Sequence, residues 1–215
     1  INSNFILQGD GDTDRKMWVG TNALLYIANH NVTVNDCRLD YNSGATFKMS
    51  GSTVTFDNVF VNDGTGTAGH AIYAYDIDDL SVYSTDFTGF SSTILLEDID
   101  VCPNDINVKI DYSTFVNHDF AAIEAYNVER MRFFTSTATG QTGVTAGLFL
   151  EDVDECLVDN STITDYTLTS VDAGGIFCHR VGALIIDGSS IRDNTDGIEA
   201  RATNVFVRNS GEIKN

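Results

Sequence analysis

The sequence predicts an all-β chain that folds as one solenoid of about eight stacked, parallel coils with about 22–29 residues each. Its apolar residues recur in the same order along most of the chain, at a period typical of a solenoid repeat. Within each repeat they alternate with polar residues, as in a strand with one buried face, and no stretch keeps the i, i+3, i+4, i+7 spacing of a helix. Val, Ile, Thr, Phe and Tyr fill the expected strands, whereas Gly, Asn, Asp and Ser fill the gaps.

Eight copies of the repeat follow one another along the chain. Residues 123–138, 148–163 and 176–191 superimpose without an internal gap, at constant steps of 25 and 28 residues. Each copy has a pair of apolar positions two residues apart, a turn, a second such pair, another turn and a third pair, which predicts three short strands per coil. In order, the copies are 25–39, 47–61, 72–87, 94–115, 123–138, 148–163, 176–191 and 198–210, and the fourth carries an inserted loop at 100–105.

One column of the repeat is polar, at the start of the third strand. It consists of Cys37, Thr85, Ser113, Ser136, Ser161, Ser189 and Ser210, and is interrupted by Val59. Small hydroxyl side chains at a repeated bend can hydrogen-bond along the stack and satisfy backbone groups. A buried nucleophile is the alternative, but no His stands at a matching position. The column is therefore interpreted as structural.

Together these columns closely resemble the right-handed parallel β-helix of the pectate lyase-like superfamily, of the kind found in phage tailspikes and secreted polysaccharide-active proteins. The resemblance covers roughly residues 21–215 and leaves residues 1–20 as an N-terminal capping segment, with Phe5, Leu7 and Trp18 expected to cover the open end. It implies a polysaccharide or cell-surface glycan as partner and a location outside the cell or on a virion surface. Because tailspike-type β-helices associate in threes, it also implies a homotrimer or a place in a larger assembly.

Composition excludes several classes of function. The chain has 31 acidic and 12 basic residues and a net charge of −19, and such a field repels nucleic acid and anionic membranes. No run of 18 apolar residues is present, so no membrane insertion is expected. The four cysteines match no zinc spacing and are expected to be free thiols. The chain begins with Ile1 and is expected to be a processed product or a piece of a longer protein.

In the first strand of each copy, the residues that alternate with the inward apolar positions should form two outward columns. Successive residues of a column are about 4.8 Å apart along the axis. Aromatic rings offer faces on which sugars stack, and carboxylates accept hydrogen bonds from sugar hydroxyls, so these columns predict an extended polysaccharide-binding face. The expected binding residues are Tyr73, Tyr75, Tyr126, Phe149, Phe177, His179 and Arg201.

Three glutamates of the same face are candidate catalytic residues. Glu97 and Glu124 are one coil and two residues apart, a diagonal on the order of 8 Å, and Glu97 and Glu151 are two coils apart, roughly 9.6 Å. Both distances are near the ~6.5–9.5 Å between the two carboxyl groups of an inverting glycosidase. The alternative, that Glu97, Glu124 and Glu151 are solvated charges on the surface of an acidic protein, is favoured.

No metal or other cofactor is expected from the sequence. Asp76, Asp98 and Asp152 share a column that Asn127 and Arg180 interrupt, and their oxygens would suit Ca²⁺. Aspartates directly after a strand are more often turn residues. The N-terminal loop 8–14 also resembles the start of a calcium loop, but Arg15 stands where glycine is needed, so a turn is expected there as well.

Three functions remain open on the sequence. The favoured one is a carbohydrate-facing module that binds polysaccharide, with cleavage as its catalytic extension. The second is a structural or decorating rod of a virion or an extracellular assembly. The third is a secreted hydrolase or lyase that acts alone. None of the ordered active-site motifs of pectate lyases, polygalacturonases or alginate epimerases is present, so the resemblance specifies the fold far more than an activity.

Overall fold

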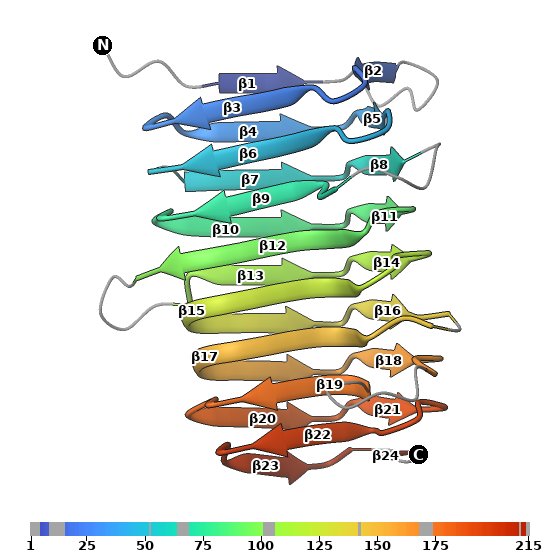
Figure 1. Cartoon of the computed structure of the whole chain (residues 1–215). Coiled ribbons are helices and arrows are strands. Elements are labelled where there is room, and N and C mark those ends of the chain that lie inside the picture. The colour runs from blue at the N-terminus through green and yellow to red at the C-terminus, as the bar shows by residue number, and fades with distance from the viewer. Residues whose placement is uncertain are drawn as a thin grey trace.

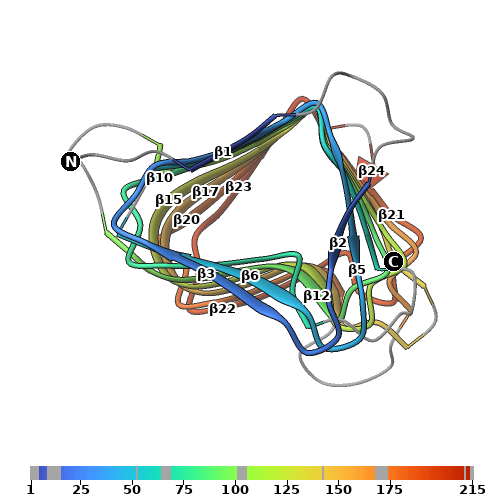
Figure 2. The ribbon, with the colours of Figure 1, turned by 90° about the horizontal axis from the view of Figure 1, so that it is seen from above.

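The computed structural model describes residues 5–8, 16–51, 53–63, 69–100, 106–141, 143–167, 174–210 and 212–213. These residues form a parallel β-solenoid in which all regular elements are strands, as the repeat predicted. Seen from the N-terminal end, the chain runs clockwise from β1 through β2 to β3 as it moves away from the viewer (Figures 1 and 2). The coil is therefore right-handed, and its cross-section has three sides.

Each coil places one strand on each of three faces. The front face, turned toward the viewer in Figure 1, is formed by β3 (Leu24–Ala28), β6 (Thr46–Ser50), β9 (Ile72–Tyr75), β12 (Ser92–Ile99), the first halves of β15 (Ala121–Phe134) and β17 (Ala146–Asp159), β19 (Gly174–His179) and β22 (Ile198–Arg201). The back face is formed by β1 (Phe5–Gln8), β4 (Val32–Asn35), β7 (Thr53–Asp57), β10 (Asp79–Tyr83), β13 (Val108–Asp111), the second halves of β15 and β17, β20 (Ala183–Asp187) and β23 (Val205–Arg208).

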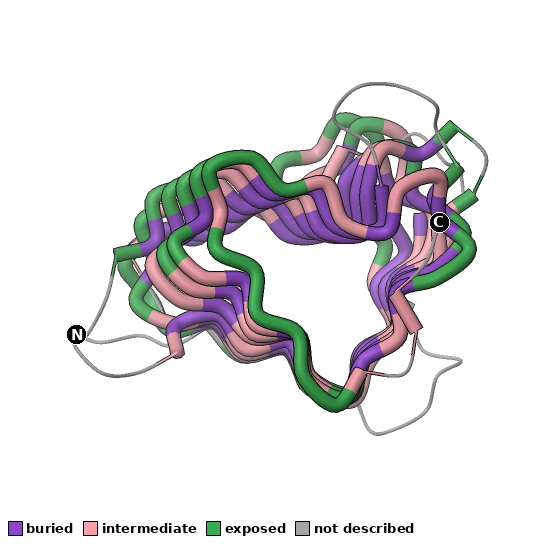
Figure 3. The backbone as a smooth tube through the Cα atoms, turned by 90° about the horizontal axis from the view of Figure 1, so that it is seen from below, coloured by how far each residue is buried: buried purple, intermediate pink, exposed green. Residues whose placement is uncertain are grey.

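A separate nine-stranded sheet forms the side face. It contains β2 (Lys16–Val19), β5 (Arg38–Tyr41), β8 (Phe60–Asp63), β11 (Asp86–Thr88), β14 (Thr114–Val116), β16 (Thr137–Thr139), β18 (Thr162–Thr164), β21 (Ser190–Arg192) and β24 (Glu212–Ile213). All strand pairs are parallel and in the register that the repeat predicted; Ile123, Leu148 and Ile176, for example, are direct neighbours. Inward side chains of all three faces fill one continuous core. The residues that are buried in it are purple along the backbone tube in Figure 3.

The polar column is structural, as predicted. The backbone N–H of Ser113 donates to Ser136 Oγ at 3.0 Å, that of Ser136 to Ser161 Oγ at 3.1 Å, and that of Ser161 to Ser189 Oγ at 3.0 Å. Each hydroxyl in turn donates to the carbonyl two residues before it, as Ser161 does to Asp159 at 2.8 Å. The serines therefore satisfy buried backbone groups from one coil to the next, because a parallel stack repeats the same bend at each level.

The N-terminal segment continues the coil rather than lying across it. Strand β1 pairs with β4 and β2 pairs with β5, both in the register of the later coils. Leu7 and Met17 pack against the core. The expectation that Trp18 covers the open end is wrong: it lies on the opposite side of β2 from Met17 and is 63% exposed. The side chain of Phe5 and loop 9–14 lie outside the described part of the chain.

The corners between faces are built from residues with positive φ. The corner that follows the front strands has Asn29, Asp76, Asp98, Asn127, Asp152 and Arg180 in the left-handed region. Asn and Asp tolerate this conformation best after glycine, which explains the Asp-rich composition of the turns. Cys37, Cys156 and Cys178 are free thiols, as expected; Cys102 lies outside the described residues.

Candidate functional site

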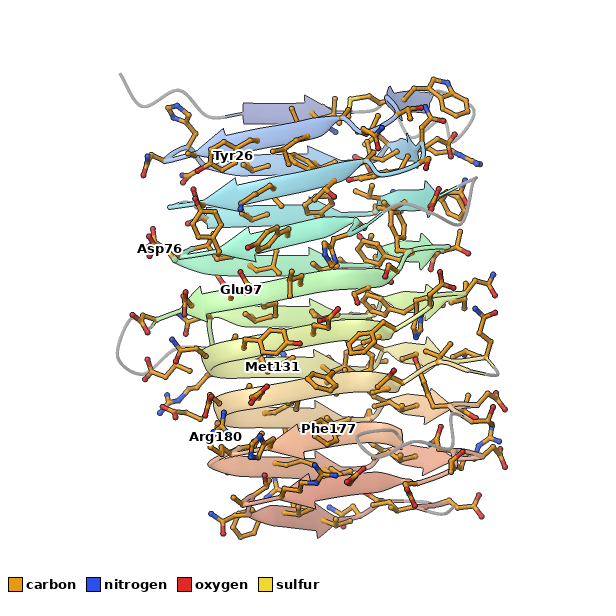
Figure 4. The ribbon with its side chains drawn as sticks, viewed as in Figure 1. Tyr26, Asp76, Glu97, Met131, Phe177 and Arg180 are labelled. Atoms are coloured by element: carbon orange, nitrogen blue, oxygen red, sulfur yellow. The ribbon has the colours of Figure 1, made fainter. Side chains whose placement is uncertain are left out.

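The structure places the two predicted outward columns on the front face. The first front column consists of Tyr26, Lys48, Tyr73, Leu95, Glu124, Phe149, Phe177 and Glu199, and the second of Ala28, Ser50, Tyr75, Glu97, Tyr126, Glu151, His179 and Arg201. In Figure 4, Tyr26, Glu97 and Phe177 lie at the upper, middle and lower levels of the strands facing the viewer. Asp76 and Arg180 lie at one edge of this face.

The upper part of the front face is a tyrosine cluster around one lysine. The Tyr26 hydroxyl lies 2.8 Å from that of Tyr75 and 3.0 Å from Ser50 Oγ. Lys48 Nζ lies 4.1 Å from the centre of the Tyr73 ring and 4.5 Å from that of Tyr75, so its charge is held over both rings. The hydrogen bond from Tyr26 lowers the pKa of the Tyr75 hydroxyl. Aromatic faces and hydroxyls thus lie side by side.

Glu97 and Glu124 form a carboxylate pair in the middle of the front face. The Tyr73 hydroxyl donates a short hydrogen bond to Glu97, and the Tyr126 hydroxyl donates to Glu124 Oε2 at 3.0 Å. Burial raises the pKa of Glu124, and the negative charge of Glu97 adds to this, while the hydrogen bond from Tyr126 opposes it. The bond to Glu97 raises the pKa of Tyr73 to about 12. The two glutamates are thus in different environments, one of which favours a protonated carboxyl group.

Below this pair lies a second aromatic cluster. The ring of Phe149 is 4.7 Å from that of Phe177 in a stacked arrangement, 5.4 Å from Phe120 and 5.9 Å from Tyr126. Phe177, one of the predicted binding residues, is only 3% exposed, so its ring has no free face on which a sugar could stack. It supports Phe149 instead, and Arg201 lies 5.4 Å from its ring centre.

The third predicted glutamate, Glu151, lies in a network of ion pairs. Arg180 Nη2 donates to Glu151 Oε1 at 2.8 Å and to Asp152 Oδ2 at 2.7 Å, and its Nε donates to Asp152 Oδ1 at 2.6 Å. His179 Nδ1 lies 3.2 Å from Glu151 Oε1. These bonds lower the pKa of Asp152 and raise that of Arg180. Because Glu151 is held in an ion pair with Arg180, it is a weaker candidate for acid–base chemistry than Glu97 and Glu124.

The column of aspartates at the edge of the front face consists of turn residues. Asp76, Asp98 and Asp152 all have positive φ, and Asn127 Nδ2 donates to Asp98 Oδ1 at 2.9 Å along the stack. Within the described ranges, no group of three or more His, Cys, Asp or Glu side chains is arranged to hold a metal ion. The hydrogen bond between coils gives this column a structural role of its own.

Several residues of the site were not identified from the sequence. Lys48 and Tyr26 belong to the first front column, one and two coils above Tyr73 respectively, and extending the column upstream finds them. Arg180 follows His179 in the corner after β19, and nothing in the spacing indicates that its side chain turns back to Glu151. Phe120 precedes β15 and has no counterpart in the repeat.

Comparisons with known proteins add no relative. No family model matches the sequence, and neither the curated proteins nor the solved structures contain a match. In the part of the chain that is described, no helix is long and apolar enough to span a membrane.

Proposed function

We propose that the chain is a carbohydrate-facing β-helix module of the pectate lyase-like kind, on a virion surface or in a secreted protein, that binds polysaccharide along its front face and cleaves it at Glu97 and Glu124. The observation that carries this proposal is the carboxylate pair itself. One member has a raised pKa, each accepts a tyrosine hydroxyl, and an aromatic cluster lies on either side of the pair along the axis.

Binding would come from repeated stacking contacts. The rings of Tyr73 and Tyr75 lie above the glutamates, and those of Tyr126 and Phe149 lie beside and below them. Neighbouring levels differ by about 4.8 Å, so a glycan running along the axis would meet rings and carboxylates in turn. The net charge of −19 and the glutamates at the centre favour a neutral glycan over a polyanionic one.

The chemistry would be hydrolysis with two carboxyl groups in different roles. Glu124, whose pKa is raised, donates its proton to the glycosidic oxygen as the bond from that oxygen to the anomeric carbon breaks. Glu97 accepts a proton from the water that attacks the anomeric carbon. The backbone positions of the two glutamates are about 8 Å apart on the diagonal, near the separation at which the carboxyl groups of an inverting enzyme admit this water. Activity should fall as the pH rises through the pKa of Glu124.

Product release and binding on a panel of neutral and acidic glycans test the proposal. Glu97→Gln and Glu124→Gln should each lower the cleavage rate by about 10²–10⁴-fold. Glu155→Gln, on the back face, is the matched control and should leave the rate unchanged. Cleavage that persists in the double variant of Glu97 and Glu124 would remove the catalytic assignment.

The binding step has its own test. Tyr75→Ala should weaken glycan binding by about tenfold or more, since one stacking face is lost, while Tyr83→Ala on the back face should not. A chain that binds no glycan would support the alternative, a structural rod. That alternative rests on the unbroken strand stack and the serine ladder, which give a rigid column regardless of what the front face binds.

A further inference from the structure

Two exposed tyrosines are in contact in the middle of the solenoid, at the corner where the back face passes into the side face (top of Figure 2). Tyr83 ends β10 and is 47% exposed, and Tyr112 follows β13 and is 49% exposed. Their ring centres are 5.2 Å apart. Among the described residues between 27 and 204, no other large apolar side chain is exposed to this extent. An aromatic pair that the core does not use is a candidate contact surface.

Tyr112 has a backbone conformation that a large side chain disfavours. Its φ is 53°, in the left-handed region, and every described coil repeats this conformation at the same corner. The other coils place smaller residues there, namely Asp36, Asn58, Ser84, Thr135, Asn160, Gly188 and Asn209. Glycine, Asn and Asp tolerate positive φ best, whereas a bulky residue is an outlier. Because the fold alone would be served better by Asn at this position, the exposed ring of Tyr112 indicates a function of its own.

A small acidic hollow lies beside the tyrosine pair. Its volume is about 130 Å³, and Asp36, Asn58, Asp86 and Ser84, the residue after Tyr83, are among those that line it. Pockets that enclose a whole small molecule have roughly 300–1,000 Å³, so this hollow suits the head group of a single side chain. Asp36 accepts hydrogen bonds from two neutral amides, those of Gln8 at 3.1 Å and Asn58 at 2.7 Å, which leave its negative charge in place.

The charge around the hollow is not balanced by nearby bases. Asp57 precedes Tyr83 in the same outward column, and within the described ranges neither Asp57 nor Asp86 forms an ion pair. Arg38 lies 4.7 Å from the ring of Phe60 at the edge of the hollow, but it is ion-paired with Asp40 at 2.9 Å. The hollow therefore favours a positively charged group.

The arrangement of the rings favours a cation over a sugar. The ring planes of Tyr83 and Tyr112 are inclined by 64°, and those of Tyr112 and Phe134 by 89°, so the three rings form no flat platform on which a sugar could stack. A cation, in contrast, is attracted to any single ring face within about 6 Å. The cluster already holds one guanidinium in this way, since Arg132 lies 5.5 Å from the centre of the Phe134 ring.

We propose that this corner docks a basic segment of a partner protein. One arginine or lysine head group enters the hollow between Asp36 and Asp86, and the residues beside it pack on Tyr83 and Tyr112, as tyrosines at the centres of interfaces do. The partner is a different, basic protein, because association of two copies would bring together two chains with a net charge of −19 each. The corner lies across the solenoid from the front face (Figure 2), so docking is independent of glycan binding and leaves the front face open.

Fluorescence anisotropy with two labelled peptides tests the docking at about 0.15 M salt. One peptide alternates arginine with leucine, and the other has glutamine in place of each arginine. The wild type should bind the arginine peptide, and Asp86→Asn and Tyr112→Asn should each weaken this binding by about tenfold. Asp119→Asn removes one exposed negative charge at the corner after β14, away from the hollow, and as the matched control it should bind the peptide as the wild type does.

Stability separates a docking role of Tyr112 from a structural one. Tyr112→Asn should unfold at the same urea concentration as the wild type or at a higher one, because Asn tolerates the φ of 53°, while peptide binding is lost. A variant that is clearly less stable would assign the ring to the fold and overturn the proposal.

The peptides supply the remaining outcomes against it. Equal binding of the glutamine peptide, an equal loss in Asp119→Asn, or no binding of the arginine peptide up to about 1 mM would each overturn the proposal. So would a neutral glycan that competes with the peptide, since the corner would then bind sugars.

Discussion

Acidification should destabilise the fold through one buried histidine, His118. Its side chain is fully buried at the corner between the side and front faces, where Nε2 lies 2.8 Å from the Tyr166 hydroxyl and Nδ1 has no hydrogen-bond partner among the described residues. Burial lowers its pKa from 6.5 to about 4, since a charged imidazole would lose its hydration there. The folded state therefore holds His118 neutral, whereas the unfolded chain can protonate it below about pH 6.5.

The sign and size of the effect follow from these two pKa values. The stabilisation is fully present above pH 6.5 and is lost progressively as the pH falls toward 4, because only the unfolded state gains the proton in this range. Between pH 7.5 and pH 5.0 the loss amounts to about 2 kcal/mol. The lower limit of pH 5.0 stays above the isoelectric point of about 4.2, near which loss of net charge promotes association.

Urea unfolding followed by circular dichroism at pH 7.5, 6.5, 5.5 and 5.0 measures this loss. The comparison is with His118→Gln, whose amide can still bond the Tyr166 hydroxyl but does not titrate. The acidic side chains are common to both proteins, so their contribution cancels in the difference between the two stability curves. The stability advantage of the wild type should shrink by about 2 kcal/mol over this range. Parallel curves would show that His118 is not held neutral and would refute the reasoning.

Three further substitutions test the packing of the coils, each by the free energy of unfolding in urea. Ser161→Ala should cost about 1–3 kcal/mol, because the buried N–H of Ser136 loses its acceptor. Gly147→Ala should cost about 2–3 kcal/mol, since a Cβ there would lie 2.5 Å from Ile163 Cγ2 and 2.8 Å from the Gly175 carbonyl oxygen. Gly20→Ala is its control. A Cβ at Gly20 would have its nearest neighbour 3.9 Å away, so alanine there should change stability by less than about 0.5 kcal/mol. Thr135→Asn should stabilise by about 0.5–1 kcal/mol, because an exposed β-branched residue at φ 46° is strained and Asn tolerates this conformation.

The repeat predicted the fold well because alternation and register are properties of the whole column. A shift of the strand register by one residue would turn every inward side chain outward. Because all eight copies place their apolar residues in the same columns, only one register buries them all. The same logic predicts that Glu97, Tyr126 and Glu151 share one column, as they do in the structure. The serine ladder was predictable for the same reason, since the bend recurs at each level.

A column predicts which way a side chain points, but it does not predict the burial and contacts of that side chain. Phe177 occupies an outward position and is nevertheless buried, because Phe149 and Arg201 lie against its ring. Trp18 was expected to cover the end of the core, but its place in β2 directs it away. In both cases the contacts depend on side chains of neighbouring coils, and the spacing within one strand contains no information about them.

The three glutamates differ in their side-chain contacts, although their column positions alone do not distinguish them. On spacing alone, Glu97 could pair with Glu124 or with Glu151 at similar distances. The structure separates the two options through the partners of each carboxylate: Arg180, in a corner position, forms an ion pair with Glu151, while Tyr73 and Tyr126 donate to Glu97 and Glu124 without adding charge. A raised carboxyl pKa is favoured where the group is desolvated and not ion-paired, and burial of Glu124 beside a second negative charge meets this condition. A positive charge brought beside Glu124 by Leu95→Lys should therefore lower its pKa and remove the acid from the proposed reaction, without changing the register of a single strand.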